Sequence, residues 1–291
     1  MLKGVYTAMI TPFREDGSVD ETALRRLVNT QIEAGIAGLV PVGTTGESPT
    51  VTHQENVAIV GIVVDEARGR VPVIAGTGSN STAEAIEMTR QAKQLGAAAS
   101  LQVAPYYNKP TQAGLYQHYM AIAEAVDLPM VVYNIPGRTA VNIETATLAQ
   151  LAGHKNIVAV KEASGSLPQM MDVLATLPSE FAVLSGDDNL AFSLTALGGS
   201  GVISVASNLI PGRIVQMIDT LMKGELEHAR RDHFSLLPLF RALFLETNPI
   251  PIKYMMYRAG LCGATHRLPM TPLAEENRQI IDGLLSQYGI V

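Results

Sequence analysis

The stretch MVVY, residues 130–133, places four apolar or aromatic side chains in a row with no polar residue between them. The stretch IVAVK, residues 157–161, is likewise apolar up to its last position. Continuous runs of this length are typical of parallel strands that are covered on both faces. Working outward from these two runs predicts eight strands, at residues 4–10, 38–42, 71–75, 99–103, 130–133, 157–161, 182–185 and 201–205.

The segments between the predicted strands are long enough for helices and carry helix start signals. Three pairs have the spacing of a capping box: Ser18 with Glu21, Thr52 with Glu55, and Ser81 with Glu84. Eight evenly spaced strand–helix units over about 220 residues favour a closed (β/α)8 TIM barrel over a doubly wound sheet. We therefore expect a barrel at residues 1–224 and a C-terminal appendage of about three helices at residues 225–291.

Composition excludes several classes of protein. The 291 residues include 21 basic and 27 acidic side chains, a net charge of −6, which argues against a nucleic-acid partner. A single cysteine, Cys262, leaves no internal disulfide and no multi-cysteine metal site, and the six histidines lack zinc spacing. No targeting segment or membrane span is expected, because the longest charge-free stretch, 189–212, is broken by Gly, Ser and Pro. The expected location is the cytoplasm.

In a TIM barrel the active site lies at the C-terminal ends of the strands. Lys161 ends an apolar run, so we expect it to be partly desolvated, which disfavours the ammonium form. A neutral amine is a nucleophile toward carbonyl groups and can form a Schiff base. The alternative is a lysine that reaches solvent or pairs with Glu162, and position alone favours neither reading.

Two other strand ends add polar groups. Tyr133 could relay protons, and Thr44 and Thr45 could extend that relay or bind an anion. Arg138 could bind a carboxylate through both nitrogens of its guanidinium group. Taken singly, these residues fit a rim tyrosine, an ordinary turn and a solvated arginine equally well or better. Together with Lys161 they fit carbonyl chemistry on a substrate that carries a carboxylate.

Other motifs are weaker. The GTGSNS stretch, residues 76–81, lacks the third glycine of a dinucleotide fingerprint. Asp187 and Asp188 could suggest a metal site, but a helix N-cap role fits better, since the next helix should begin there. Tyr106 and Tyr107 are adjacent, which is more typical of an interface than of catalysis.

The motifs GTTGE (43–47), YNIPGRT (133–139) and VKEAS (160–164) resemble those of the pyruvate-dependent class I aldolase superfamily. Within it, the chain resembles the dihydrodipicolinate synthase family over essentially its whole length, including PYYNKP (105–110) and GDD (186–188). The resemblance implies a lyase that condenses pyruvate with L-aspartate 4-semialdehyde. The product lies on the path to diaminopimelate and lysine.

The resemblance also implies roles for single residues. Lys161 would form the Schiff base with pyruvate, and Tyr133 would relay protons through Thr44 and Tyr107. The remaining substrate contacts would come from Thr45 at the pyruvate carboxylate, Arg138 at the semialdehyde carboxylate, and Gly186 and Ile203 in the pocket lining. Tyr107 would cross into a neighbouring subunit of a homotetramer built from tight dimers. No metal or organic cofactor is expected.

Feedback inhibition by lysine is a further implication. The residues that match the allosteric pocket of inhibited family members are Ser48, His53, Asn80, Glu84 and Tyr106. Two positions depart from that pattern, because Asn56 stands where sensitive members usually carry His or Glu, and Pro49 where many carry Ala. We expect a pocket that binds lysine weakly, with Glu84 opposite its ammonium group.

Three alternatives stay open on the residues. A sialic acid or keto-deoxy sugar acid lyase would use the same lysine and tyrosine, although such relatives differ at Arg138 and often carry Ser in place of Thr44. A non-catalytic barrel that senses a small acid would need no nucleophile. A phosphate-binding barrel would need a glycine-rich turn after the last strands, whereas GGSG, residues 198–201, precedes the eighth strand.

Overall fold

The computed structural model describes residues 2–291, and it contains an eight-stranded parallel sheet in the order β2-β1-β8-β7-β6-β5-β4-β3. The strands are β1 (Gly4–Ala8), β2 (Gly38–Val40), β3 (Ile74–Gly76), β4 (Ala99–Val103), β5 (Met130–Asn134), β6 (Ile157–Glu162), β7 (Ala182–Ser185) and β8 (Gly201–Ser204). The two end strands of this order meet through a parallel bridge between Leu39 and Val73. The Leu39 N–H donates to the Pro72 carbonyl at 3.0 Å, which brings the two edges together. The predicted (β/α)8 barrel is confirmed.

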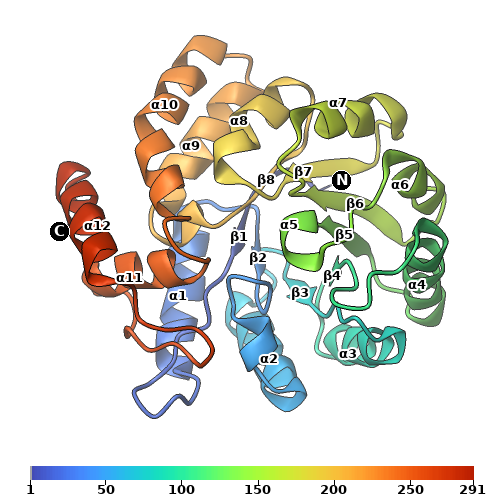
Figure 1. Cartoon of the computed structure of the whole chain (residues 1–291), viewed down its shortest axis with the longest axis horizontal. Coiled ribbons are helices and arrows are strands. Elements are labelled where there is room, and N and C mark those ends of the chain that lie inside the picture. The colour runs from blue at the N-terminus through green and yellow to red at the C-terminus, as the bar shows by residue number, and fades with distance from the viewer. Residues whose placement is uncertain (1) are drawn as a thin grey trace.

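Helices surround the strands, and α5 lies near the centre of Figure 1, over the strand ends. The barrel helices are α1 (Glu21–Glu33), η1 (Ser48–Thr50), α2 (His53–Ala67), α3 (Thr82–Gln94), α4 (Gln112–Ala125), α5 (Pro136–Thr139), α6 (Thr145–Leu151), α7 (Leu167–Thr176), α8 (Asp188–Ala196), η2 (Ala206–Asn208) and α9 (Pro211–Met222). After the barrel come α10 (Leu226–Ala242), α11 (Ile250–Arg258) and α12 (Glu275–Gln287), the three helices expected of the appendage. The division of the chain at residues 224 and 225 stays a prediction.

The helix start signals were correct in part. Thr52 and Glu55 form a complete capping box at the start of α2. Ser81 caps α3, but the Glu84 carboxylate accepts a hydrogen bond from Ser79 instead of closing the box. The prediction for Ser18 is wrong, because α1 begins at Glu21 and the Asp20 side chain accepts from the backbone N–H of its third residue.

The third strand also begins later than predicted. The run from residue 71 contains Pro72, which has no backbone N–H to donate to a sheet. Regular pairing with β4 starts only at Ile74, opposite Ala99, and extends to Gly76. The stretch 189–212 forms most of α8, a turn, β8 and η2, and no helix among residues 2–291 is both long and apolar enough to cross a membrane.

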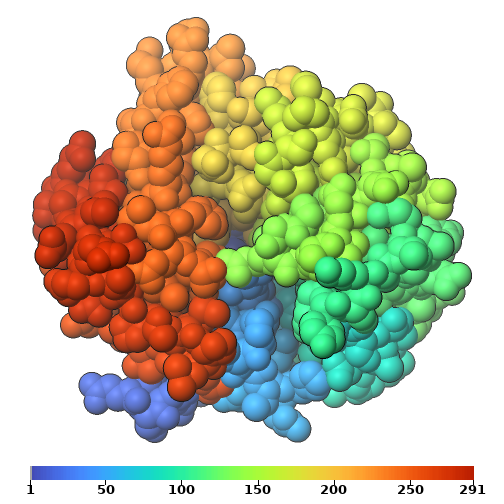
Figure 2. All heavy atoms as spheres, in the orientation of Figure 1, coloured from blue at the N-terminus to red at the C-terminus, as the bar shows by residue number. Residues whose placement is uncertain are grey.

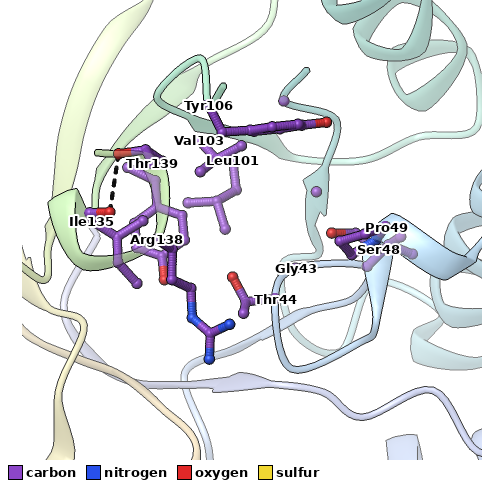
Figure 3. A pocket seen from close by; sticks show the side chains of 14 residues that line it. Gly43, Thr44, Ser48, Pro49, Leu101, Val103, Tyr106, Ile135, Arg138 and Thr139 are labelled. Carbon is purple, nitrogen blue, oxygen red and sulfur yellow. Dashed lines mark hydrogen bonds between the residues drawn. The ribbon is translucent and has the colours of Figure 1, made fainter. Parts of the chain in front are cut away.

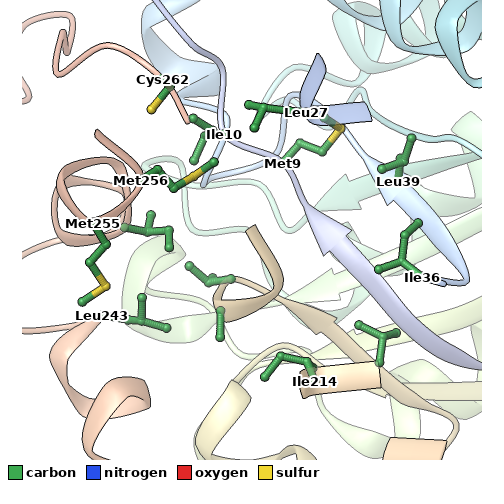
Figure 4. Close-up of a cluster of buried hydrophobic side chains, with 14 of the residues drawn as sticks. Met9, Ile10, Leu27, Ile36, Leu39, Ile214, Leu243, Met255, Met256 and Cys262 are labelled. Atoms are coloured by element: carbon green, nitrogen blue, oxygen red, sulfur yellow. The ribbon is translucent and has the colours of Figure 1, made fainter. Parts of the chain in front are cut away.

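The appendage shares its core with one side of the barrel. Buried side chains of α10 and α11, such as Leu239 and Met256, belong to the same apolar cluster as Met9 and Ile10, which follow β1 (Figure 4). Figure 1 shows α12 at the edge of the molecule, next to α11. The appendage therefore completes this part of the hydrophobic core.

A buried ion pair fixes the appendage to the barrel. The Lys253 ammonium, on α11, lies 2.6 Å from a carboxylate oxygen of Glu47, and both side chains are at most 1% exposed. Lys253 also donates to the Thr265 carbonyl at 2.7 Å, and the second Glu47 oxygen accepts from the Arg267 backbone N–H at 3.2 Å. Burial lowers the pKa of Lys253, and the Glu47 carboxylate opposes that shift.

We predict that Lys253→Met lowers the free energy of unfolding by about 3–5 kcal/mol, because it leaves the Glu47 carboxylate buried without its counter-ion. Urea denaturation measures the change. The matched control is Lys155→Met, since Lys155 and Asp127 form a pair that is largely exposed, and it should leave stability unchanged. The added substitution Glu47→Gln should recover part of the loss in Lys253→Met. Equal free energies of unfolding for Lys253→Met and Lys155→Met would contradict the prediction.

Candidate active site

Lys161 points into the barrel. It lies in β6 opposite Tyr133 of β5 and Leu184 of β7, and both of these neighbours belong to the apolar cluster inside the barrel. Side chains on one strand alternate between faces, so Ala159, Lys161 and Ala163 share the inner face. The Lys161 side chain is 4% exposed, and its amine lies 4.2 Å from the centre of the Tyr133 ring. The reading of Lys161 as a solvated lysine is therefore wrong, and so is that of Tyr133 as a rim residue in water, since Tyr133 is also 4% exposed.

Gly186 leaves room for this lysine. It follows β7, and a Cβ atom built on it would lie 2.6 Å from the Ala163 Cβ and 3.1 Å from the Lys161 Cε. Ile203 lies in β8, also in the inner cluster. Gly186 and Ile203 therefore line the barrel interior on the side of Lys161 that faces β7 and β8.

The turn that carries the two threonines has a constrained backbone. Val42 and Glu47 bracket it with positive φ angles of 54° and 55°, which are uncommon for residues other than glycine and are rarest for β-branched ones. Gly76 is required beside it, because a Cβ there would lie 2.1 Å from the Val42 carbonyl oxygen. Backbone strain of this kind concentrates at functional sites and needs support from the surrounding structure.

Part of that support comes from Asn248, a residue that sequence reasoning missed. Its side-chain amide nitrogen donates to the Thr45 hydroxyl at 3.0 Å, and its backbone carbonyl accepts from the Arg138 guanidinium at 3.0 Å. Thr45 is buried, whereas Arg138 is exposed. The only local signal for Asn248 was a polar residue before a proline, which does not reveal contacts to positions more than 100 residues away.

A cavity of about 310 Å³ brings several predicted residues together. In Figure 3 the Arg138 guanidinium extends toward Thr44, while Tyr106 lies across from Ser48 and Pro49. The residues that line the cavity are Val42, Gly43, Thr44, Ser48, Pro49, Gly76, Gly78, Leu101, Val103, Tyr106, Tyr133, Ile135, Arg138 and Thr139. Predicted catalytic and predicted regulatory residues therefore share one cavity above the strand ends.

Asp187 and Asp188 differ from the predicted N-cap role. Asp187 occupies the N-cap position of α8, but its side chain makes no capping bond. Asp188 is buried and turned toward β8, where its carboxylate accepts from the Ser204 hydroxyl and from the N–H groups of Val205 and Ala206. Burial raises the pKa of both carboxyl groups. The Lys161 charge opposes the shift at Asp187, and the hydrogen bonds from Ser204, Ala206 and Val205 oppose it at Asp188. Asp188 therefore ties the start of α8 to the end of β8 and the start of η2.

Most of the predicted lysine-binding residues lie together beside the cavity. The Asn80 amide donates to the Tyr106 carbonyl at 3.2 Å, and a His53 ring nitrogen lies 4.0 Å from the Glu84 carboxylate. Ser48 lies across the cavity from Tyr106. Asn56, one of the departures from the family pattern, is buried, and its amide donates to the Gly76 carbonyl at 3.0 Å.

Of the four predicted catalytic residues, Thr44 and Tyr133 line the cavity, whereas Lys161 lies within the barrel and Tyr107 points away from this chain into solvent. The Tyr107 side chain is 91% exposed and its φ angle is +71°.

Within residues 2–291, no group of three or more His, Cys, Asp or Glu side chains is arranged to hold a metal ion.

A buried amine on the inner face of a (β/α)8 barrel, beside a phenol and a turn of hydroxyl groups, defines the site of a class I aldolase-type lyase. The chain matches the Dihydrodipicolinate synthetase family over residues 1–288, and it belongs to that family. It is 49% identical over 291 residues, all of both chains, to a 4-hydroxy-tetrahydrodipicolinate synthase of Pelobacter propionicus.

Two solved structures are also similar. One is the chloride-inhibited dihydrodipicolinate synthase of Acinetobacter baumannii in complex with pyruvate, at 44% identity, a TM-score of 0.98 and full coverage of both chains. The other is the enzyme of Cyanidioschyzon merolae with lysine bound, at 42% identity and a TM-score of 0.97, covering 100% of this chain and 99% of that one.

Proposed function

We propose that Lys161 is the Schiff-base nucleophile of a 4-hydroxy-tetrahydrodipicolinate synthase, which joins pyruvate to L-aspartate 4-semialdehyde in lysine and diaminopimelate biosynthesis. The observation that carries this assignment is the Lys161 amine buried inside the barrel, 4.2 Å from the Tyr133 ring. The family membership supports the reaction, and the pyruvate complex of the Acinetobacter baumannii relative supports the first substrate.

The reaction begins with the Lys161 nitrogen attacking the keto carbon of pyruvate. Water leaves, and the resulting imine loses a methyl proton to give an enamine. The enamine carbon forms a bond to the aldehyde carbon of the semialdehyde, whose oxygen takes up a proton. The semialdehyde amine then attacks the imine carbon, which closes the ring and releases Lys161. The Lys161 nitrogen thus accepts an electron pair when the methyl proton leaves and returns it when the new carbon–carbon bond forms.

The neighbouring residues hold and protonate these species. Thr45, with its backbone N–H, binds the pyruvate carboxylate, and Arg138 binds the semialdehyde carboxylate. Tyr133 moves protons between the reacting atoms and bulk water through Thr44 and the Tyr107 of a neighbouring subunit. Gly186 and Ile203 shape the pocket around the imine.

Tyr107 supports an assembly of more than one chain. A tyrosine side chain that is 91% exposed, on a backbone held at positive φ, suits a contact in which it enters a second subunit. We propose a homotetramer built from tight dimers in which Tyr107 completes the partner's proton relay, and a cytoplasmic location.

Lysine is the proposed feedback inhibitor. Charged and polar groups beside the cavity come from Ser48, His53, Asn80, Glu84 and Tyr106. The lysine-bound Cyanidioschyzon merolae relative supports lysine as the ligand of this site. Asn56 in place of His or Glu removes one charged or ionisable group from this site, which favours weak binding.

Sodium borohydride tests the nucleophile directly. Reduction in the presence of pyruvate should trap a covalent adduct, and peptide mass spectrometry should place it on Lys161. Lys161→Ala should give no adduct and lose most of the turnover. Lys253 is the internal comparison, because it is also buried. An adduct on Lys253, or none in the wild type, would refute the mechanism.

The role of Arg138 separates binding of the two substrates. Arg138→Ala should raise the KM for the semialdehyde about tenfold or more, because a charge-assisted contact to its carboxylate is lost. Imine formation with pyruvate should stay at the wild-type level in the trapping assay. Equal loss of imine formation would place Arg138 elsewhere in the reaction, and turnover of sialic acid in place of the semialdehyde would support the sugar-acid lyase alternative.

Isothermal titration tests the regulatory site. Lysine at millimolar concentration should give saturable heat, and Glu84→Ala should weaken it, since the carboxylate pairs with the ligand ammonium. Glu87→Ala is the matched control, because Glu87 lies on the same helix and pairs with Arg90 and Gln91 of that helix. Absence of heat from the wild type would rule out the site.

A further inference from the structure

Asn248 lies between the two groups proposed to bind the substrate carboxylates. It belongs to the link between α10 and α11 and is 4% exposed. Its side chain contacts Thr45 and its backbone contacts Arg138, each at 3.0 Å. Thr45 follows β2 and Arg138 follows β5, so a single residue of the appendage joins two separate parts of the barrel mouth.

The direction of the Thr45 contact matters for binding. A hydroxyl has one proton to donate and two lone pairs that can accept. Because the Asn248 amide nitrogen donates to the Thr45 oxygen, the hydroxyl proton is left for another acceptor. Asn248 thus orients Thr45 as a hydrogen-bond donor, which is the role that binding a carboxylate requires.

The placement of Asn248 is itself fixed. Lys253, five residues later, forms the buried ion pair with Glu47, which lies two residues past Thr45. The appendage therefore holds the GTTGE turn at two points, and it holds α5 through Arg138. In Figure 2 the yellow-green surface around α5 meets the orange surface of the appendage next to the blue surface of the β2–α2 region.

A contribution to the stability of the fold does not explain why an amide side chain stands at position 248. The side-chain oxygen of Asn248 is buried without a hydrogen-bond partner, which is unfavourable for folding. Buried polar groups that lack a hydrogen-bond partner are expected at positions where function requires them.

We propose that Asn248 is a positioning residue that sets the orientation of the Thr45 hydroxyl and its distance from the Arg138 guanidinium. It thereby fixes the separation at which the pyruvate imine and the semialdehyde carboxylate are held. This proposal rests on the proposed function. Asn248 acts through Thr45 and Arg138 and makes no contact with the reacting atoms.

The test combines Asn248→Ala with borohydride trapping over a range of pyruvate concentrations. Half-maximal trapping at Lys161 should need about five- to tenfold more pyruvate, the cost of one lost hydrogen bond. The KM for the semialdehyde should rise less than the value for pyruvate, because the backbone carbonyl that binds Arg138 is retained, and kcat should stay within about twofold. Asn277→Ala is the matched control, because this amide also lies in the appendage but donates to Glu246, and it should behave as the wild type.

The double variant Thr45→Val, Asn248→Ala tests whether Asn248 acts through Thr45. The valine removes the acceptor, so adding Asn248→Ala to Thr45→Val should change half-maximal trapping less than twofold. Asn248→Asp covers the case in which the alanine variant folds poorly. Its carboxylate would accept the Thr45 proton instead of donating, so pyruvate binding should weaken at an unchanged melting temperature.

The outcomes separate the two proposals. An unchanged half-maximal concentration in both Asn248 variants, or an undiminished effect of Asn248→Ala in the Thr45→Val background, would overturn the positioning role. A lower melting temperature with both KM values unchanged would make Asn248 a structural residue only. Absence of an adduct in the wild type would instead refute the proposed function.

Discussion

The register between β5 and β6 is the constraint on which the rest of the site depends. Tyr133 lies opposite Lys161, so both side chains leave the sheet on the same face and enter the barrel. A slip of one residue would turn the lysine toward the surrounding helices and bring Val160 or Glu162 inside. The glycine at position 186 then decides how much space the lysine has, because any larger side chain would press on its Cε and on Ala163.

The appendage is part of the site as well as part of the core. Strands of the barrel position the amine and the phenol, but the turn after β2 has two residues in a left-handed conformation and needs contacts from outside its own strand. Asn248 and Lys253 supply these contacts from a segment that follows the eighth strand by more than 40 residues. The barrel alone therefore specifies where the nucleophile lies, and the appendage specifies the groups arranged around it.

Sequence reasoning worked where the signal was local. Apolar runs marked each strand to within a few residues, and a helix start such as Thr52 with Glu55 was correct because both partners lie within one turn. It failed where partners are distant in the chain. Asp188 was assigned to the nearest helix, whereas its carboxylate binds β8 and η2. Lys253 and Glu47 are 206 positions apart, and neither has a neighbour in sequence that reveals the pair. The direction of Lys161 could not be predicted either, since it follows from pairing between strands.

The buried pair between Glu47 and Lys253 has a consequence for biosynthesis of the protein. During translation the N-terminal parts of a chain emerge first. All eight strands leave the ribosome before Asn248 and Lys253 do, so the turn after β2 is synthesised before either of these two anchors. The contacts that hold this turn can therefore form only once the segment that carries Asn248 and Lys253 has been synthesised.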